Sequence, residues 1–173
     1  NSYHNNNTIT TNNTVLDYPQ DPKSQHKLID STKKSSKISD LVMKIANLMS
    51  SVAKRQQIRF EFNFSDNDVI IAADVSQIEQ VLINIIKNAI ESIENDGTIT
   101  FETTHQPPQL LVIDTGKGIQ KGIEEQLFSP FFSTKRNGQG VGLTLIREIL
   151  VNHGFGLSLH TEQEGKTVFR VRF

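Results

Sequence analysis

Two asparagines four residues apart, Asn84 and Asn88, are the first side chains whose types and spacing point to ligand chemistry. The four-residue step puts both amides on one helix face, with Lys87 beside them. Amide oxygens can coordinate a hard cation such as Mg²⁺, and an ammonium group can meet phosphate oxygens. A polar stripe alone is more often the solvent face of a surface helix. Asparagine is a mediocre helix former, however, so the pair favours a binding role.

A carboxylate follows an apolar strand pattern further along the chain. The run Leu110–Ile113 leads directly into Asp114, and Gly116 and Gly118 come shortly after it. A lone aspartate at a strand end is a turn former about as often as it is functional. A carboxylate nevertheless suits the exocyclic amino donor of adenine and does not suit the carbonyl acceptor of guanine. Glycines at these positions permit positive φ angles and a close approach of a ligand to the backbone.

A phenylalanine-rich loop provides a candidate phosphate contact. Phe128, Phe131 and Phe132 stand in a loop flanked by glycines. We expect these rings to anchor the loop on the domain, while Thr134 and Lys135 stay free. Lys135 is then the side chain that reaches phosphate.

A glycine-rich stretch leads into a helix that is expected to begin at Val141. Gly138, Gly140 and Gly142 surround that position. Such glycines leave backbone N–H groups exposed at the positive end of the helix dipole, and this combination binds anions. A glycine-rich stretch alone is usually just a flexible loop. Neither common phosphate-loop pattern fits, because G-x-x-x-x-G-K-[ST] is absent and Leu143 replaces the third glycine of G-x-G-x-x-G.

Hydrophobic periodicity places these residues on an α/β framework. The helix Val75–Ile93 carries an apolar face opposite the asparagines, and Asp74 with Gln77 forms an N-cap signal before it. We expect Val69–Ala72 to pair with Ile58–Phe64 through a tight turn. The other expected elements are a helix from residue 37 to about 52, strands Thr98–Thr103 and Leu110–Ile113, a helix Val141–Asn152, and a hairpin of Phe155–Thr161 with Thr167–Phe173. Interleaved helices and paired strands favour a mixed sheet in a two-layer sandwich.

The composition fits one folded domain behind an arm. Of 173 residues, 36% are hydrophobic and 21% are charged, which suits a soluble globular domain. The net charge of -1 gives no electrostatic case for nucleic acid or an anionic membrane as a partner, and the absence of cysteine excludes disulfides and thiolate metal sites. No apolar run approaches the roughly 20 residues that span a bilayer. We expect a cytoplasmic domain over 37–173 and a linker or poorly ordered arm over 1–36.

Taken in order, the four candidate segments resemble the N, G1, F and G2 boxes of the GHKL superfamily, which includes gyrase, the heat-shock chaperone ATPase, MutL and the histidine kinases. The resemblance covers Ile38–Phe173. It is strongest to sensor histidine kinases of bacterial two-component systems, of the nitrogen-regulation type, through Gln77–Leu82, Asn84, Asn88 and Phe131–Lys135. It implies a Bergerat ATP-binding fold, an α+β two-layer sandwich whose mixed sheet is covered on one face by helices, with a glycine-hinged lid over about residues 122–140.

The resemblance implies ATP and Mg²⁺ as cofactors and assigns a role to each matching residue. Asn88 would hold Mg²⁺ with Asn84 close to it, and Asp114 would accept the adenine amino group. Lys87 and Lys135 would meet the phosphates and complete the catalytic set. The implied nucleotide-binding residues are Asn84, Asn88, Asp114, Gly116, Gly118, Ile119, Thr134, Lys135, Gly138, Gly140, Val141, Gly142, Leu143 and Thr167.

The residue at position 84 separates kinase from hydrolase within this superfamily. Hydrolytic members carry glutamate there to activate water, and the amide of Asn84 cannot act as a general base. The resemblance therefore implies an ATP:protein-histidine phosphotransferase. Its partners would be a dimerisation domain that carries the acceptor histidine and, downstream, a response regulator. Two alternatives stay open: a degenerate GHKL nucleotide-binding or interaction module, and a GHKL protein-serine kinase.

The acceptor histidine is expected outside this chain. An acceptor would stand in the context H-[ED]-x-[RK]-[TN]-P, which no histidine here has. We therefore interpret all five as surface or packing residues: His4, His26, His105, His153 and His160. The domain itself is expected to contact neither nucleic acid nor membrane, and the sequence leaves open whether the whole kinase is membrane-anchored.

Overall fold

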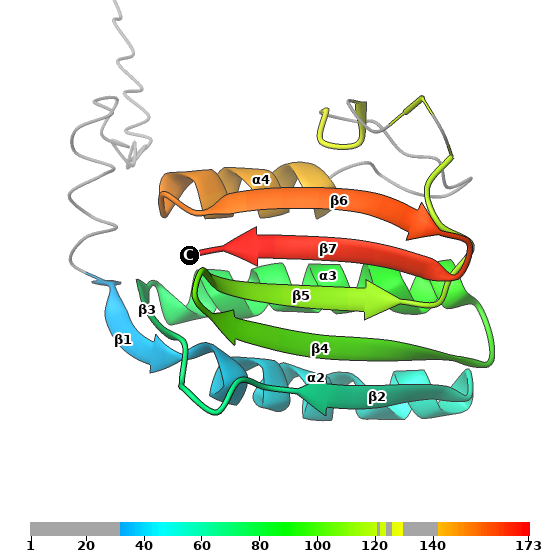
Figure 1. The fold of residues 1–173 in the computed structure, drawn as a ribbon, viewed down its shortest axis with the longest axis horizontal. Helices are drawn as coiled ribbons and strands as arrows, with labels where there is room; N and C mark the ends of the chain where they lie inside the picture. The colour runs from blue at the N-terminus through cyan, green and yellow to red at the C-terminus, as the bar shows by residue number, and fades with distance from the viewer. Residues whose placement is uncertain (1–31, 121, 124–125, 130–141) are drawn as a thin grey trace, which may run out of the picture.

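The computed structural model describes residues 32–120, 122–123, 126–129 and 142–173, and a mixed five-stranded sheet forms its centre (Figure 1). In spatial order the strands are β2 (Ile58–Asn63), β4 (Gly97–His105), β5 (Pro108–Asp114), β7 (Lys166–Arg172) and β6 (Gly156–Gln163). β2 and β4 run parallel, whereas the other neighbours are antiparallel. The mixed sheet and the β6–β7 hairpin confirm the sequence-based expectation.

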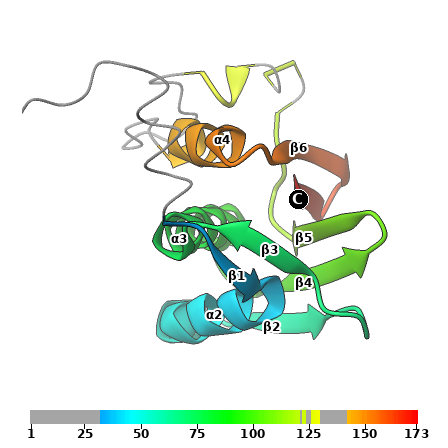
Figure 2. The same ribbon diagram turned by 90° about the vertical axis from the view of Figure 1, so that its left-hand side faces the viewer.

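Three helices cover the same face of this sheet (Figure 2). They are α2 (Ile38–Arg55), α3 (Val75–Ile93) and α4 (Gly142–Asn152). α3 lies between the other two and contacts both, which explains why Val81 and Ile90 are buried on its flanks as well as the expected core face. The core between the layers includes Phe101, Ile86 and Leu110, each at most 1% exposed. The predicted two-layer sandwich is confirmed.

The predicted pairing of the segment after Ser65 is wrong. β3 (Ile70–Ala73) pairs antiparallel with β1 (Lys34–Lys37) in a separate two-stranded sheet, and it does not pair with β2. The reason is connectivity, because β1 runs directly into α2 and β3 leads directly to α3. Both strands therefore lie at one end of the helix layer, where the Ile38 amide donates to the Val69 carbonyl. The boundary that the sequence predicts between the arm (1–36) and the domain (37–173) falls inside β1.

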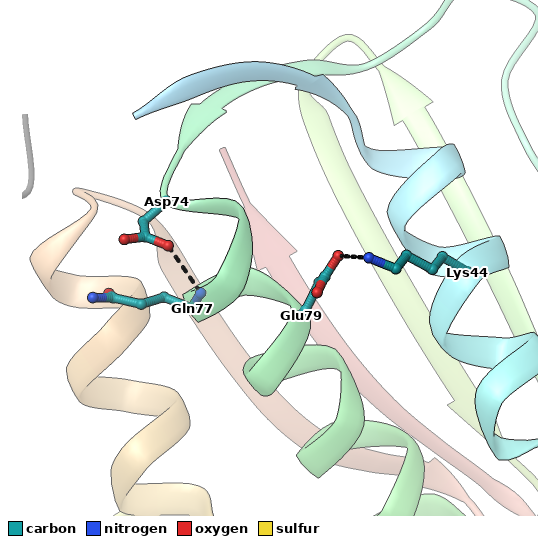
Figure 3. A network of polar contacts seen from close by, with 4 residues as sticks. All are labelled: Lys44, Asp74, Gln77 and Glu79. Carbon is teal, nitrogen blue, oxygen red and sulfur yellow. Dashed lines mark hydrogen bonds and ion pairs between the residues drawn. The ribbon is translucent and has the colours of Figure 1, made fainter. Parts of the chain in front are cut away.

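Asp74 caps the start of α3 as predicted, and His153, at the end of α4, adds a further hydrogen bond to this cap. Asp74 Oδ1 accepts from the Gln77 amide at 3.2 Å (Figure 3). The Asp74 amide donates to Nε2 of His153 at 3.1 Å, and Nδ1 of the same ring donates to the Ile149 carbonyl at 2.7 Å. This buried imidazole thus needs its proton on Nδ1 and ties the end of α4 to the beginning of α3. The interpretation of His153 as a packing residue is confirmed.

The α2 and α3 helices are also joined at their surface. Lys44 Nζ lies 2.6 Å from Glu79 Oε1 (Figure 3). The lysine is largely exposed, so this pair contributes little to stability. Within the described residues, no helix combines the length and the apolar character needed to cross a bilayer.

Candidate functional site

A polar stripe on α3 forms one wall of the candidate site. Asn84, Asn88 and Ser92 recur at four-residue steps and are each half-buried. Asn84 Nδ2 donates to the Gln80 carbonyl at 2.9 Å, which leaves its Oδ1 directed away from that bond. A Cβ atom added to Gly142 would lie 3.7 Å from this Oδ1, so the start of α4 adjoins the first asparagine. The stripe then runs about 12 Å along the helix to Ser92.

Lys87 lies on the solvent side of the stripe. Its side chain is 62% exposed, and Nζ stands 3.9 Å from Glu91 Oε1 one turn along the helix. The sequence-based expectation placed this ammonium beside phosphate. In the structure Lys87 is an exposed lysine beside the stripe, and Glu91 is the partner that the described residues give it.

Asp114 closes the far end of the stripe. The residue is 7% exposed, and its Oδ1 accepts from the Gly116 amide at 2.9 Å. Burial raises the pKa of Asp114 to about 6, while the hydrogen bonds from Gly116 and from the Ser92 side chain oppose that rise. Across the described residues, no cation forms an ion pair with it. A buried carboxylate without a cation costs stability, which is typical of a functional group.

Two glycines after Asp114 are required by the packing. A Cβ atom at Gly116 would lie 2.2 Å from Ser92 Oγ and 2.7 Å from Asp114 Oδ1. Gly118 has a φ of 77°, and a Cβ there would lie 2.9 Å from Thr161. The expected positive φ is found at Gly118 and not at Gly116. At Gly116 the atoms that exclude a larger side chain belong to Ser92 and Asp114.

The loop that carries these glycines is held from three directions. The Lys117 amide donates to the Ser92 carbonyl at 3.3 Å, which ties the loop to α3. Thr115 exchanges two hydrogen bonds with Thr98 of β4. The Ile119 amide donates to Thr161 Oγ1 of β6 at 2.8 Å. Hydrogen bonds to α3, β4 and β6 therefore fix the floor of the site.

Thr167 joins this floor from β7. It is the cross-strand partner of Asp114, is 4% exposed, and its Oγ1 lies 3.2 Å from Thr161 Oγ1. Lys166 precedes it, so its side chain leaves on the other face of the strand. There Lys166 Nζ pairs with Glu162 Oε2 at 2.7 Å. The lysine thus stays out of the site.

The described part of the phenylalanine loop is anchored as expected. Phe128 packs edge-on against Phe169 with ring centroids 6.5 Å apart, and Leu127 is buried. Thr144 Oγ1 donates to the Ser129 carbonyl at 3.3 Å, which connects the segment to α4. The remaining expected positions of this region lie outside the described residues: Phe131, Phe132, Thr134, Lys135, Gly138, Gly140 and Val141.

Sequence reasoning missed two residues of the site, Ser92 and Thr161. Ser92 follows Asn88 by one helical turn, so extending the four-residue step would have found it. Thr161 and Thr167 end the two strands of the predicted hairpin, and pairing those strands would have placed the two hydroxyls side by side. The sequence therefore indicated Ser92 through helical periodicity and Thr161 through the predicted hairpin.

Comparison with known proteins agrees with this geometry. Residues 73–173 match the family described as histidine kinase-, DNA gyrase B- and HSP90-like ATPase. The sensor histidine kinase ZraS of Salmonella typhi is 32% identical over 137 residues, which cover 78% of this chain and 30% of that protein. The sensory histidine kinase/phosphatase NtrB of Rhodobacter capsulatus is 34% identical over 113 residues, which cover 57% of this chain and 32% of NtrB. The chain thus spans about a third of the length of these relatives.

A solved structure shares the fold at similar identity. The catalytic domain of histidine kinase ThkA superposes with a TM-score of 0.70 at 31% identity, over 80% of this chain and 93% of that one. ThkA has also been solved in complex with the response regulator protein TrrA. Taken with the polar stripe, the buried aspartate and the fixed glycine loop, these matches show that the chain belongs to the histidine kinase-, DNA gyrase B- and HSP90-like ATPase family, as a catalytic domain of the sensor histidine kinase type.

Proposed function

We propose that this chain binds Mg²⁺-ATP along α3 and presents the γ-phosphate to a histidine on a dimerisation domain of the same kinase. The observation that carries the proposal is the relation between the two ends of the stripe. At one end stands a buried Asp114, which forms no ion pair with any described residue, and at the other stands Asn84 with the start of α4. From Asn84 to Ser92, which hydrogen-bonds Asp114, the helix rises about 12 Å, and this length suits an extended nucleoside triphosphate.

The adenine end follows from hydrogen-bond chemistry. An ionised Asp114 only accepts hydrogen bonds, so it suits the amino group of adenine and repels the carbonyl of guanine. Thr167 lies opposite it and provides a hydroxyl at the same depth. Gly116 and Gly118 let the loop pack closely against Ser92 and Thr161, and this packed loop would form the floor on which a flat base lies.

The phosphate end has donors that fit a hard cation. With its nitrogen bonded to the Gln80 carbonyl, Asn84 offers an amide oxygen toward the start of α4. Oxygen ligands of this kind suit Mg²⁺, which keeps several waters and shares phosphate oxygens. Asn88 and Asn84 would hold the ion, which would supply neutralisation of the phosphate charge. The backbone amides of the first turn of α4, which begins at Gly142, would contact the phosphates. Further phosphate contacts would come from Lys87, Thr134, Lys135, Gly138 and Gly140.

Transfer to histidine is favoured over hydrolysis. Phosphoryl transfer depends mainly on positioning and charge neutralisation, and an acceptor imidazole is itself the nucleophile. The amide at position 84 cannot activate water. The relatives are sensor kinases, and the ThkA complex with a response regulator supports a response regulator as the downstream partner here. Because the ATP pool is cytoplasmic, we place the domain on that side of any membrane.

Phosphoamino-acid stability in the full-length protein tests this function. Labelled phosphate from ATP should appear on the protein as an acid-labile, base-stable adduct, and Asn88→Ala should abolish it. This chain alone should hydrolyse ATP slowly and take up no label on histidine. An acid-stable adduct would instead support the serine-kinase alternative, and nucleotide binding without any transfer would support the interaction module.

A further inference from the structure

Thr161 occupies a junction that the proposed ATP site does not yet explain. Its Oγ1 accepts from the Ile119 amide at 2.8 Å and lies 3.2 Å from Thr167 Oγ1. Its side chain also fills the space where a Cβ of Gly118 would stand. One side chain on β6 therefore contacts both the glycine loop and the threonine opposite Asp114.

The contacts of Thr161 set the direction of its hydroxyl proton. A hydroxyl has one proton to donate and two lone pairs to accept with. Ile119 donates to Thr161 Oγ1, and Thr167 Oγ1 lies within hydrogen-bond distance of the same hydroxyl, so we assign the Thr161 proton to Thr167. In the reverse order Thr161 Oγ1 would accept both hydrogen bonds, and its own proton would depend on solvent.

In this order the hydroxyl proton of Thr167 is not used by Thr161, so Thr167 can donate it to a ligand beside Asp114, its cross-strand partner. Asp114 accepts hydrogen bonds at the same cross-strand position where Thr167 then donates one. Adenine presents an amino donor flanked by ring-nitrogen acceptors, which matches an acceptor beside a donor. Guanine presents a carbonyl acceptor in place of the amino group, so its pattern fails at Asp114.

We propose that Thr161 is a positioning residue for base recognition: it orients the Thr167 hydroxyl as a donor and so makes the pocket selective for adenine. The proposal rests on the nucleotide site proposed above. A site built to pair a polar group of its substrate discriminates strongly against an analogue that lacks the group, because buried polar groups are then left unpaired.

The test measures binding of nucleotide analogues to the whole chain by calorimetry. The analogues 1-deaza-ATP and 7-deaza-ATP each remove one of the ring nitrogens that flank the amino group. The wild-type chain should bind one of them about tenfold more weakly than ATP, since one hydrogen bond is lost. Thr161→Val should weaken ATP binding by about tenfold. The variant should then bind ATP and that analogue with about equal affinity. Thr161→Ser keeps the hydroxyl, so it should match the wild-type chain both in ATP affinity and in the loss of affinity for the analogue.

Thr100→Val is the matched control, because it makes the same change on β4, on the opposite face of the sheet, and should alter neither affinity. Equal affinity of the wild-type chain for ATP and both analogues would overturn the assignment, whether or not the variants fold. A Thr161→Val chain that loses ATP affinity but keeps the full analogue penalty would show a purely structural role and overturn it too. Failure of the folded wild-type chain to bind ATP at all would overturn the proposed function itself.

Discussion

The Ser92 side chain of α3 hydrogen-bonds the Asp114 carboxylate at the end of β5. This contact links the polar stripe of the helix to the adenine end of the proposed site. It also opposes the rise in the Asp114 pKa that burial causes. The protonation of Asp114 should therefore affect both the stability of the domain and its affinity for nucleotide, and both should depend on pH.

Asp114→Asn should stabilise the ligand-free chain while it removes ATP binding. Burial raises the Asp114 pKa from 3.8 to about 6, so the folded state keeps the proton more readily than the unfolded state. Stability from this group is therefore greatest below pH 3.8, falls as the pH rises to about 6, and stays low above it. At neutral pH the cost is roughly 1–3 kcal/mol. Thermal unfolding at pH 7 should show the variant above wild type, and a less stable variant would contradict this account of the carboxylate.

Binding of the base should weaken when Asp114 is protonated. The adenine amino group hydrogen-bonds the charged form, so affinity should be constant well above pH 6 and decline as the pH falls through about 6. Adenosine is the right ligand, because it carries no titrating phosphate, and NMR shift titrations can follow weak binding. A profile that is flat from pH 8 to pH 5 would argue against Asp114 as the base acceptor.

Ser92→Ala should move that pH profile upward. The serine hydroxyl favours the charged carboxylate, and its loss leaves burial less opposed, so the Asp114 pKa should rise further. The affinity of the variant for adenosine should fall below wild type near pH 6–7 and approach it at pH 8. Ser76→Ala, on the exposed first turn of the same helix, is the control and should leave the profile unchanged.

His153→Phe should destabilise the domain without changing the site directly. The new ring can keep the stacking on Phe155, but the Asp74 amide loses its acceptor and the Ile149 carbonyl loses a donor. Leaving a buried backbone donor unpaired costs about 1–3 kcal/mol. Urea unfolding measures this loss. His160→Gln, a half-exposed histidine on β6, should change stability by less than about 0.5 kcal/mol.

Gly116→Ala should damage the site through sterics alone. The added methyl would lie 2.2 Å from Ser92 Oγ and 2.7 Å from the Ser92 carbonyl carbon, so the loop or the helix end must shift. We expect a loss of about 1–3 kcal/mol in stability together with weaker ATP binding. At Gly156 the nearest atom to an added Cβ is 3.7 Å away, so Gly156→Ala is a control that should bind ATP normally.

The sequence predicted those parts of the fold that local periodicity determines. The helix Val75–Ile93 and its Asp74 cap were found because apolar spacing and capping chemistry are local signals. The pairing of β3 was missed because its partner β1 is a polar four-residue strand with no alternation to reveal it. Likewise, the bond from the Asp74 amide to His153 joins residues 79 positions apart, and no spacing rule reaches that far.

The central claim is that the pocket around Asp114 binds adenine nucleotide, and a calorimetric titration of the whole chain with ATP and GTP, with and without Mg²⁺, tests it most directly. The account predicts that ATP binds, that Mg²⁺ strengthens the binding, that GTP binds at least about tenfold more weakly, and that Asp114→Asn abolishes binding of ATP. Equal affinity for the two nucleotides, or no binding of ATP by a folded sample, would contradict it.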